Sequence, residues 1–115
     1  MKKLFTLSTL YFLLCTITAS AAVSITKSGG WYESAYVEWT KQEGYSYNVY
    51  VSPAAADAWT QLDYQLVREY PAFGRADALG LSAGSYKLKV VPVKDEVEIT
   101  AEAAETGSLT VVNHD

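Results

Sequence analysis

The chain has 115 residues, the length of a single domain, and half of its residues are hydrophobic. Its formal net charge is −4; beyond residue 21 it keeps 94 residues with seven basic and thirteen acidic side chains, a net charge of −6. This acidic balance argues against nucleic acid and anionic membrane surfaces as partners.

The first 21 residues have the three parts of a secretory signal peptide. Two lysines follow Met1, a mostly apolar run extends from Leu4 to Ile17, and small residues surround Ala21. The run is shorter than the roughly 20 apolar residues that a membrane-spanning helix needs. We therefore expect cleavage after Ala21, or one residue later, and a secreted or periplasmic product.

Cys15 is the sole cysteine and lies inside this apolar run. Leucines precede it instead of the small residues of a lipidation site, which disfavours a lipoprotein. Without the signal peptide the domain, residues 22–115, has no cysteine, so we expect it to be held together by its hydrophobic core. We expect no thiol chemistry, no metal and no cofactor.

Beyond the signal peptide the sequence predicts about seven short strands and no long helix. The expected strands are residues 23–26, 34–40, 45–51, 59–62, 73–79, 86–93 and 108–112. Gly29 and Gly30 are expected to break the first strand, and Pro53 to end the third because proline has no N–H for the ladder. Residues 42–44 form a polar turn, residues 54–58 one helical turn at most, and residues 63–70 a helical turn. Residues 95–107 are an acidic loop that can extend the neighbouring strands. The pattern predicts an all-β, immunoglobulin-like antiparallel sandwich.

Four residues are expected to have structural roles. Alternation within residues 34–40 and 45–51 places Trp39 and Tyr47 on the core side of their strands. Tyr86 follows a turn centred on Gly84 at the start of a strand, as in the tyrosine corner of immunoglobulin-like sandwiches. In that motif the tyrosine hydroxyl bonds back to the backbone a few residues upstream.

No catalytic residue is expected. His114, the single histidine, lies one residue from the end of the chain, where neither a fixed partner nor a pocket is expected. Asp95, Glu96 and Glu98 lack the spacing and the glycine of a calcium loop, so a solvated acidic loop is the better interpretation.

Basic and aromatic residues give the candidate binding site. Arg75 and Asp77 share a strand face, so they can form an ion pair that closes the sandwich. Alternatively, Arg75 with Arg68 can bind a sugar acid, because a guanidinium matches a carboxylate. Outward aromatic side chains can stack on sugar rings. The candidate glycan-binding residues are Arg68, Arg75, Trp59, Tyr50 and Trp31.

Several short strings carry a family resemblance. They are Glu33-Ser34-Ala35-Tyr36-Val37-Glu38-Trp39, Tyr47-Asn48-Val49-Tyr50, Arg75-Ala76-Asp77-Ala78 and Leu81-x-x-Gly84-x-Tyr86-Lys87-Leu88-Lys89-Val90-Val91-Pro92-Val93. In this order they resemble the N-terminal fibronectin type III-like domain of secreted bacterial pectate lyases of polysaccharide lyase family one. The resemblance covers nearly all of residues 28–115.

The resemblance implies a non-catalytic accessory domain that acts as a spacer or docking module. In that family a β-helix carrying the catalytic arginine and calcium follows this domain, and none of its positions occurs in this chain. The implied partners are plant cell-wall polysaccharide or a neighbouring catalytic domain, and the domain is expected to be monomeric, without membrane contact once the signal is cleaved. Two alternatives stay open: a carbohydrate-binding module for acidic glycans such as pectate, or a fragment of a pectate lyase.

Overall fold

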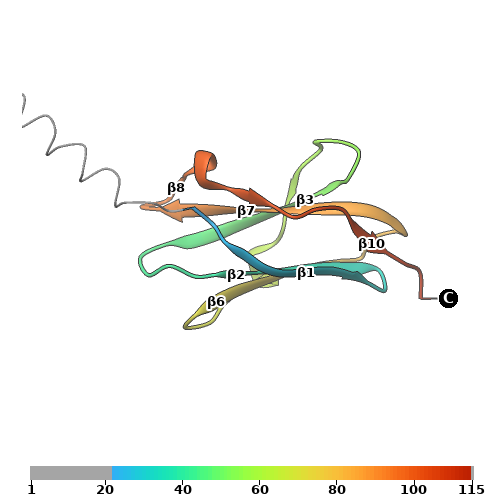
Figure 1. The fold of residues 1–115 in the computed structure, drawn as a ribbon, viewed down its shortest axis with the longest axis horizontal. Coiled ribbons are helices and arrows are strands. Elements are labelled where there is room, and N and C mark those ends of the chain that lie inside the picture. Colours follow the sequence, from blue (N-terminus) through green and yellow to red (C-terminus); the bar gives the residue numbers. More distant parts are fainter. Residues whose placement is uncertain (1–21, 115) are drawn as a thin grey trace, which may run out of the picture.

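Two antiparallel β-sheets pack face to face in the computed structural model, which describes residues 22–114 (Figure 1). The first sheet has the order β1 (Ile25–Trp31), β2 (Ser34–Thr40), β6 (Phe73–Leu79), β5 (Val67–Glu69). The second has the order β10 (Leu109–Val111), β7 (Gly84–Lys94), β3 (Ser46–Pro53), β4 (Thr60–Gln61), and β8 (Val97–Glu98) and β9 (Ala104–Glu105) also pair with β7. Two single turns of 3₁₀ helix complete the fold: η1 (Tyr64–Leu66) and η2 (Thr100–Glu102).

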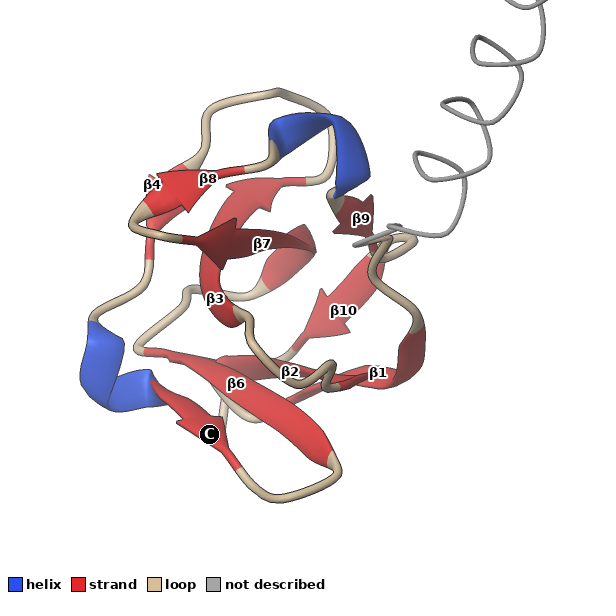
Figure 2. Cartoon of the chain, turned by 90° about the vertical axis from the view of Figure 1, so that its left-hand side faces the viewer, coloured by secondary structure: helices blue, strands red, loops and turns tan. Residues whose placement is uncertain are grey.

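This arrangement confirms the expected antiparallel sandwich. The four-strand order and the β10–β7–β3 order correspond to the two sheets of an immunoglobulin-like fold, and the two layers are separate in Figure 2. All seven expected strands are present, and the three additional strands have two or three residues each. The expected signal peptide, residues 1–21, lies outside the described residues. No helix within residues 22–114 is long and apolar enough to cross a membrane.

The core lies between the sheets and follows the alternation of the sequence. Val37 and Trp39 of the first sheet and Val49, Leu88 and Val90 of the second are fully buried. Burying side chains of this size contributes about 1.5–3 kcal/mol each. The alternate residues of the same strands therefore form the two outer faces of the sandwich.

Trp39 and Tyr47 meet in this core, with their ring centroids 5.4 Å apart. Trp39 is paired with Gly74 on β6, and a Cβ atom at Gly74 would lie 2.4 Å from the indole ring. The indole therefore lies directly against the glycine. The Tyr47 hydroxyl accepts a hydrogen bond of 2.9 Å from the backbone N–H of Gln42, within the expected turn.

The tyrosine corner has the expected geometry. The Tyr86 hydroxyl donates a 2.9 Å hydrogen bond to the carbonyl oxygen of Ser82, four residues upstream. Gly84, the expected centre of the turn, is the first residue of β7. The bond therefore anchors the segment that leads from the first sheet into the second.

The expectation that Gly29 and Gly30 break the first strand was wrong. β1 continues through both glycines to Trp31, and each residue from Lys27 to Trp31 is paired with β2. A Cβ atom at Gly30 would lie 1.7 Å from the carbonyl oxygen of Thr110 on β10. Glycine is required here because the edge strands of the two sheets touch, and not because the chain turns.

Of the two intermediate segments, the second departs from its expected structure. Residues 54–58 form a turn without a helix, in which the buried Ser52 hydroxyl donates to the carbonyl of Ala56 and accepts from the N–H of Ala58. Residues 63–70 contain the expected helical turn as η1, but β5 follows it and pairs with β6. A three-residue strand at a sheet edge depends on its neighbour rather than on its own sequence.

Residues 95–107 are more ordered than a solvated loop. Instead of extending a neighbouring strand, β8 and β9 pair with β7 as short antiparallel edge strands, and η2 lies between them. The carbonyl oxygen of Pro92 accepts a hydrogen bond from the N–H of Ile99, on the side of β7 where β8 and β9 pair. An N–H at position 92 would point to this same side, but proline has none. The missing donor thus coincides with the interruption of the edge strand.

Candidate functional site

The outer face of the first sheet carries the main cluster of polar and aromatic side chains. Three neighbouring strands place side chains opposite each other in rows: Trp31, Ser34 and Leu79 form one row, and Gly29, Tyr36 and Asp77 form the next. Glu38 and Arg75 follow in a third row, with Arg68 opposite Arg75 on β5. We call this surface the Arg75 face.

Arg75 is the centre of an ion-pair network. Its Nε and Nη2 atoms donate to the two carboxylate oxygens of Asp77 at 3.1 and 3.0 Å, and its Nη1 donates to Glu38 at 2.7 Å. Arg68 donates to the same Asp77 carboxylate at 2.6 Å. The ion pair expected between Arg75 and Asp77 is therefore present, and each arginine has a carboxylate partner.

This network fixes the charge state of Arg75. The hydrogen bonds that Arg75 donates to Asp77, and to a smaller extent the one that it donates to Glu38, raise the pKa of Arg75 above its ordinary value, while partial burial opposes them. The guanidinium also lies over the Tyr36 ring, with its central carbon 4.4 Å from the ring centroid. Carboxylates on two sides and an aromatic ring thus hold its position.

An open hollow of about 300 Å³ lies beside this network. It is lined by Trp31, Ser34, Tyr36, Arg75 and Asp77. Ser34, in the floor of the hollow, is small and stands between the larger Trp31 and Leu79 in its row. Trp31 forms one side and is 67% exposed, and its ring makes a T-shaped contact with the Tyr32 ring at a centroid distance of 5.2 Å. An indole face is therefore available next to a set of hydrogen-bonding groups.

The outer face of the second sheet carries a different cluster. The Lys89 Nζ atom lies 4.5 Å from the centroid of the Trp59 ring and 5.3 Å from that of the Tyr50 ring. The Lys87 Nζ atom lies 5.1 Å from the Trp59 centroid. Lys87 also pairs with Asp57 at 2.7 Å. Because two ammonium groups cover the half-buried Trp59, little of its ring is open to a sugar.

Glu98 accepts hydrogen bonds from Tyr50 and from Asn48 on this second face. The bond to Glu98, together with burial and the charge of the carboxylate, raises the pKa of Tyr50 to about 12. The same bond, and that from Asn48, lower the pKa of Glu98. Glu98 therefore ties β8 to β3, a role that the expected solvated loop did not give it.

The structure separates the five candidate glycan-binding residues into two groups. Arg68, Arg75 and Trp31 lie on the Arg75 face, and Tyr50 and Trp59 lie on the outer face of the second sheet. The groups therefore cannot act as one site. Sequence reasoning did not include Ser34, Tyr36 and Glu38 in the site, although the alternation of residues 34–40 placed all three outward.

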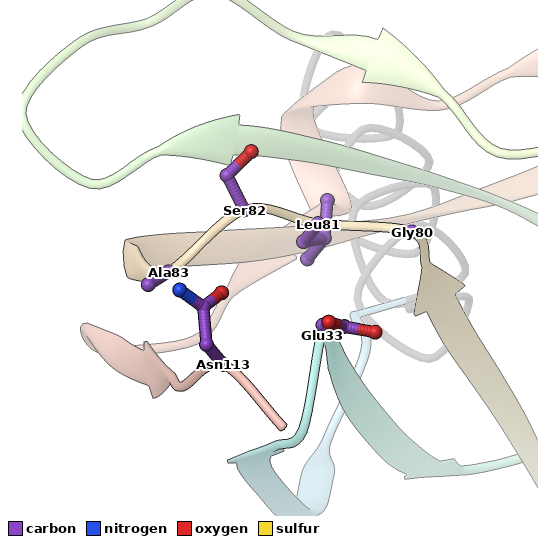
Figure 3. Close-up of a pocket in the computed structure, with 6 residues that line it drawn as sticks. All are labelled: Glu33, Gly80, Leu81, Ser82, Ala83 and Asn113. Atoms are coloured by element: carbon purple, nitrogen blue, oxygen red, sulfur yellow. The ribbon is translucent and has the colours of Figure 1, made fainter. Parts of the chain in front are cut away.

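A larger hollow, of about 530 Å³, lies at one end of the sandwich. It is lined by Glu33, Gly80, Leu81, Ser82, Ala83 and Asn113 (Figure 3). The Ser82 hydroxyl and the Asn113 side chain lie on opposite sides of the 80–83 segment (Figure 3). No nucleophile is paired with a base in this lining, and residues 22–114 hold no cluster of three potential metal ligands.

Comparison with known proteins gives a likeness of fold. No protein-family model matches the chain, and no curated protein matches it. Chitinase ChiW from Paenibacillus sp. str. FPU-7, described as a bacterial cell-surface-expressed multi-modular enzyme machinery, matches it with a TM-score of 0.56 at 10% identity. The match covers 78% of this chain and 8% of that enzyme. At this identity the likeness shows the fold alone.

Proposed function

We propose that the chain is a non-catalytic accessory module of an exported polysaccharide-degrading system, which holds polysaccharide without cleaving it. The observation that carries this proposal is the Arg75 face. There an exposed indole, Trp31, borders an open hollow whose other walls are hydrogen-bonding groups. Exposed aromatic faces with adjacent polar groups are suited to sugar rings, which are apolar on their faces and polar at their edges.

Two further observations support the proposal. The first 21 residues are typical of an exported protein, because two lysines, an apolar run and small residues around Ala21 follow one another. The similarity of fold to part of a multi-modular chitinase is consistent with an accessory role. The resemblance to pectate lyase leader domains names a finer candidate, in which the partner is a pectate lyase and the polysaccharide is plant cell-wall pectate.

An alternative is a module for acidic glycans. It needs a cation that is free to meet a uronate, whereas Arg68 and Arg75 already meet carboxylates on the Arg75 face. On the second face, Lys89 lies between Tyr50 and Trp59 and is the better candidate for that alternative.

The experiment has two parts. The full chain is expressed in a bacterial host and fractionated, and the processed protein is expected in the periplasm or the medium. The purified protein is then incubated with insoluble cell-wall polysaccharide, and bound protein, reducing ends and ultraviolet-absorbing unsaturated products are measured. Retention without product supports the proposal. Product release that follows the protein through purification, or retention of the unprocessed chain in the cytoplasm, would refute it.

A further inference from the structure

We infer that the ligand of the Arg75 face is an uncharged polysaccharide, and that the hollow beside Trp31 is its sugar-binding subsite. This inference rests on the proposed function and deepens it by assigning a ligand class and a position. Three properties of the face lead to it: the balance of charge, the remaining hydrogen-bonding capacity and the size of the hollow.

The charges that line the hollow cancel. Arg75 and Asp77 are its charged residues, and they are joined by two hydrogen bonds. A uronate that approached Arg75 would meet the Asp77 carboxylate on the same side, and like charges at short distance repel. A cationic sugar would meet the guanidinium in the same way. An uncharged sugar meets neither repulsion.

The network leaves hydrogen-bonding groups that match sugar hydroxyls. A guanidinium has five N–H donors, and three of those of Arg75 are used by Asp77 and Glu38. The remaining donors, the Ser34 hydroxyl and the free lone pairs of Asp77 give the hollow both donors and acceptors. A sugar hydroxyl is a donor and an acceptor at once, so it can use both kinds of group.

The hollow has a shape suited to one ring. Its volume of about 300 Å³ is at the lower end of the range for small-ligand sites. One side is the exposed indole of Trp31, on which a pyranose can stack, and the opposite side is the Arg75–Asp77 pair. Its open form leaves room for the chain of a polymer to continue on either side.

Affinity electrophoresis tests the ligand class. The purified protein is run in native gels containing hydroxyethylcellulose, β-glucan, glycol chitin or galactan, and in gels containing polygalacturonate or alginate. We expect retardation by at least one uncharged polymer and none by the acidic polymers. Retardation by the acidic polymers alone, or by none of the six, would overturn the inference.

Two variants test the position. Trp31→Ala is expected to weaken retardation at least tenfold, because truncating a central aromatic anchor typically has an effect of this size. The matched control is Tyr64→Ala, which removes an aromatic side chain that is 80% exposed on η1, away from this face. Equal retardation of the two variants would place the site elsewhere.

A third variant tests the charge argument directly. Asp77→Asn keeps the size of the side chain but removes the carboxylate that Arg68 contacts and leaves Arg75 with Glu38. We expect this variant to gain retardation in polygalacturonate that disappears with added salt. A variant that stays indifferent to polygalacturonate would refute the charge argument, and unfolding midpoints show whether each variant is folded.

The outcomes separate this inference from the proposed function. Retention on acidic polymer without cleavage, lost in Lys89→Ala, would leave an accessory module but refute the uncharged ligand. Release of products from any polymer would refute the accessory module itself.

Discussion

Substituting Gly30 by alanine tests whether the contact between the two edge strands holds the sandwich closed. The Cβ atom of an alanine would lie 1.7 Å from the carbonyl oxygen of Thr110 and 2.5 Å from its carbonyl carbon. Both of these atoms belong to the backbone of β10, so no side chain can rotate away. The strands β1 and β10 must separate by more than 1 Å, on the order of the overlap itself, to accommodate the methyl group.

The cost follows from what this movement breaks. Two backbone hydrogen bonds lie just beyond Gly30. The N–H of Val112 donates to the carbonyl oxygen of Trp31 at 3.2 Å, and the N–H of Glu33 donates to the carbonyl oxygen of Val112 at 2.9 Å. Each of these bonds contributes about 0.5–1.5 kcal/mol, and overpacking costs a further ~1–3 kcal/mol. We therefore expect a loss of about 2–6 kcal/mol, a large fraction of the typical 5–15 kcal/mol of a domain.

Urea unfolding followed by tryptophan fluorescence measures this loss. The matched control is Gly107→Ala, because no atom lies within 4 Å of the added methyl group, and surface changes of this kind stay within about 0.5 kcal/mol. If Gly30→Ala unfolds at the same urea concentration as Gly107→Ala, the edge strands do not touch as described and the interpretation of Gly30 is wrong.

Three further predictions concern single hydrogen-bonding groups. Tyr86→Phe removes the bond to Ser82 and is expected to lower stability by about 1 kcal/mol; an unchanged unfolding midpoint would remove the tyrosine corner. Glu98→Gln is expected to return the pKa of Tyr50 from about 12 toward its ordinary value near 10, measured by NMR titration of labelled tyrosine; a pKa that stays near 12 would contradict the assigned cause. The same pair predicts the pH dependence of stability. The raised pKa of Tyr50 gives a contribution that is complete below about pH 10 and is lost as pH rises through about 12, whereas the lowered pKa of Glu98 gives one that is lost in acid, below its ordinary value near 4.3. Urea midpoints measured in acid and above about pH 10 check this pH dependence. If the midpoint of the wild type falls no more than that of Glu98→Gln in either range, the predicted pH dependence is wrong.

The alternation of the sequence predicted much of the core. Val37, Trp39, Leu88 and Val90 point inward as the period of two requires. This signal is local, because the direction of a side chain depends on its own position in the strand. It succeeds wherever one face of a strand is buried.

Features that depend on distant partners were not predictable in this way. β5 exists because β6 offers it a ladder, and Gly30 continues a strand because Thr110, 80 positions later, lies against it. Glu98 looked like part of a solvated loop because Tyr50 and Asn48 are far from it in sequence. In each case a long-range contact overrides the local preference of the residues.

The division of the candidate site follows from the same limit. Alternation shows that Arg75 and Tyr50 both point outward, but not which sheet each strand joins. Because β6 pairs with β2, Arg75 lies on the outer face of the first sheet. Because β3 pairs with β7, Tyr50 lies on the outer face of the second sheet.

Whether Arg75 is free to bind a ligand also depends on two residues, one on its own strand and one on the neighbouring strand. Asp77 is visible as a partner in the sequence, because residues two apart in a strand share a face. Glu38 becomes a partner through the pairing of β2 with β6. An outward arginine is therefore free to bind a uronate only when both positions lack a carboxylate: two residues along its own strand and opposite on the neighbouring one. Arg75 fails both conditions, so its chemistry is that of a fixed, neutralised donor beside an open indole.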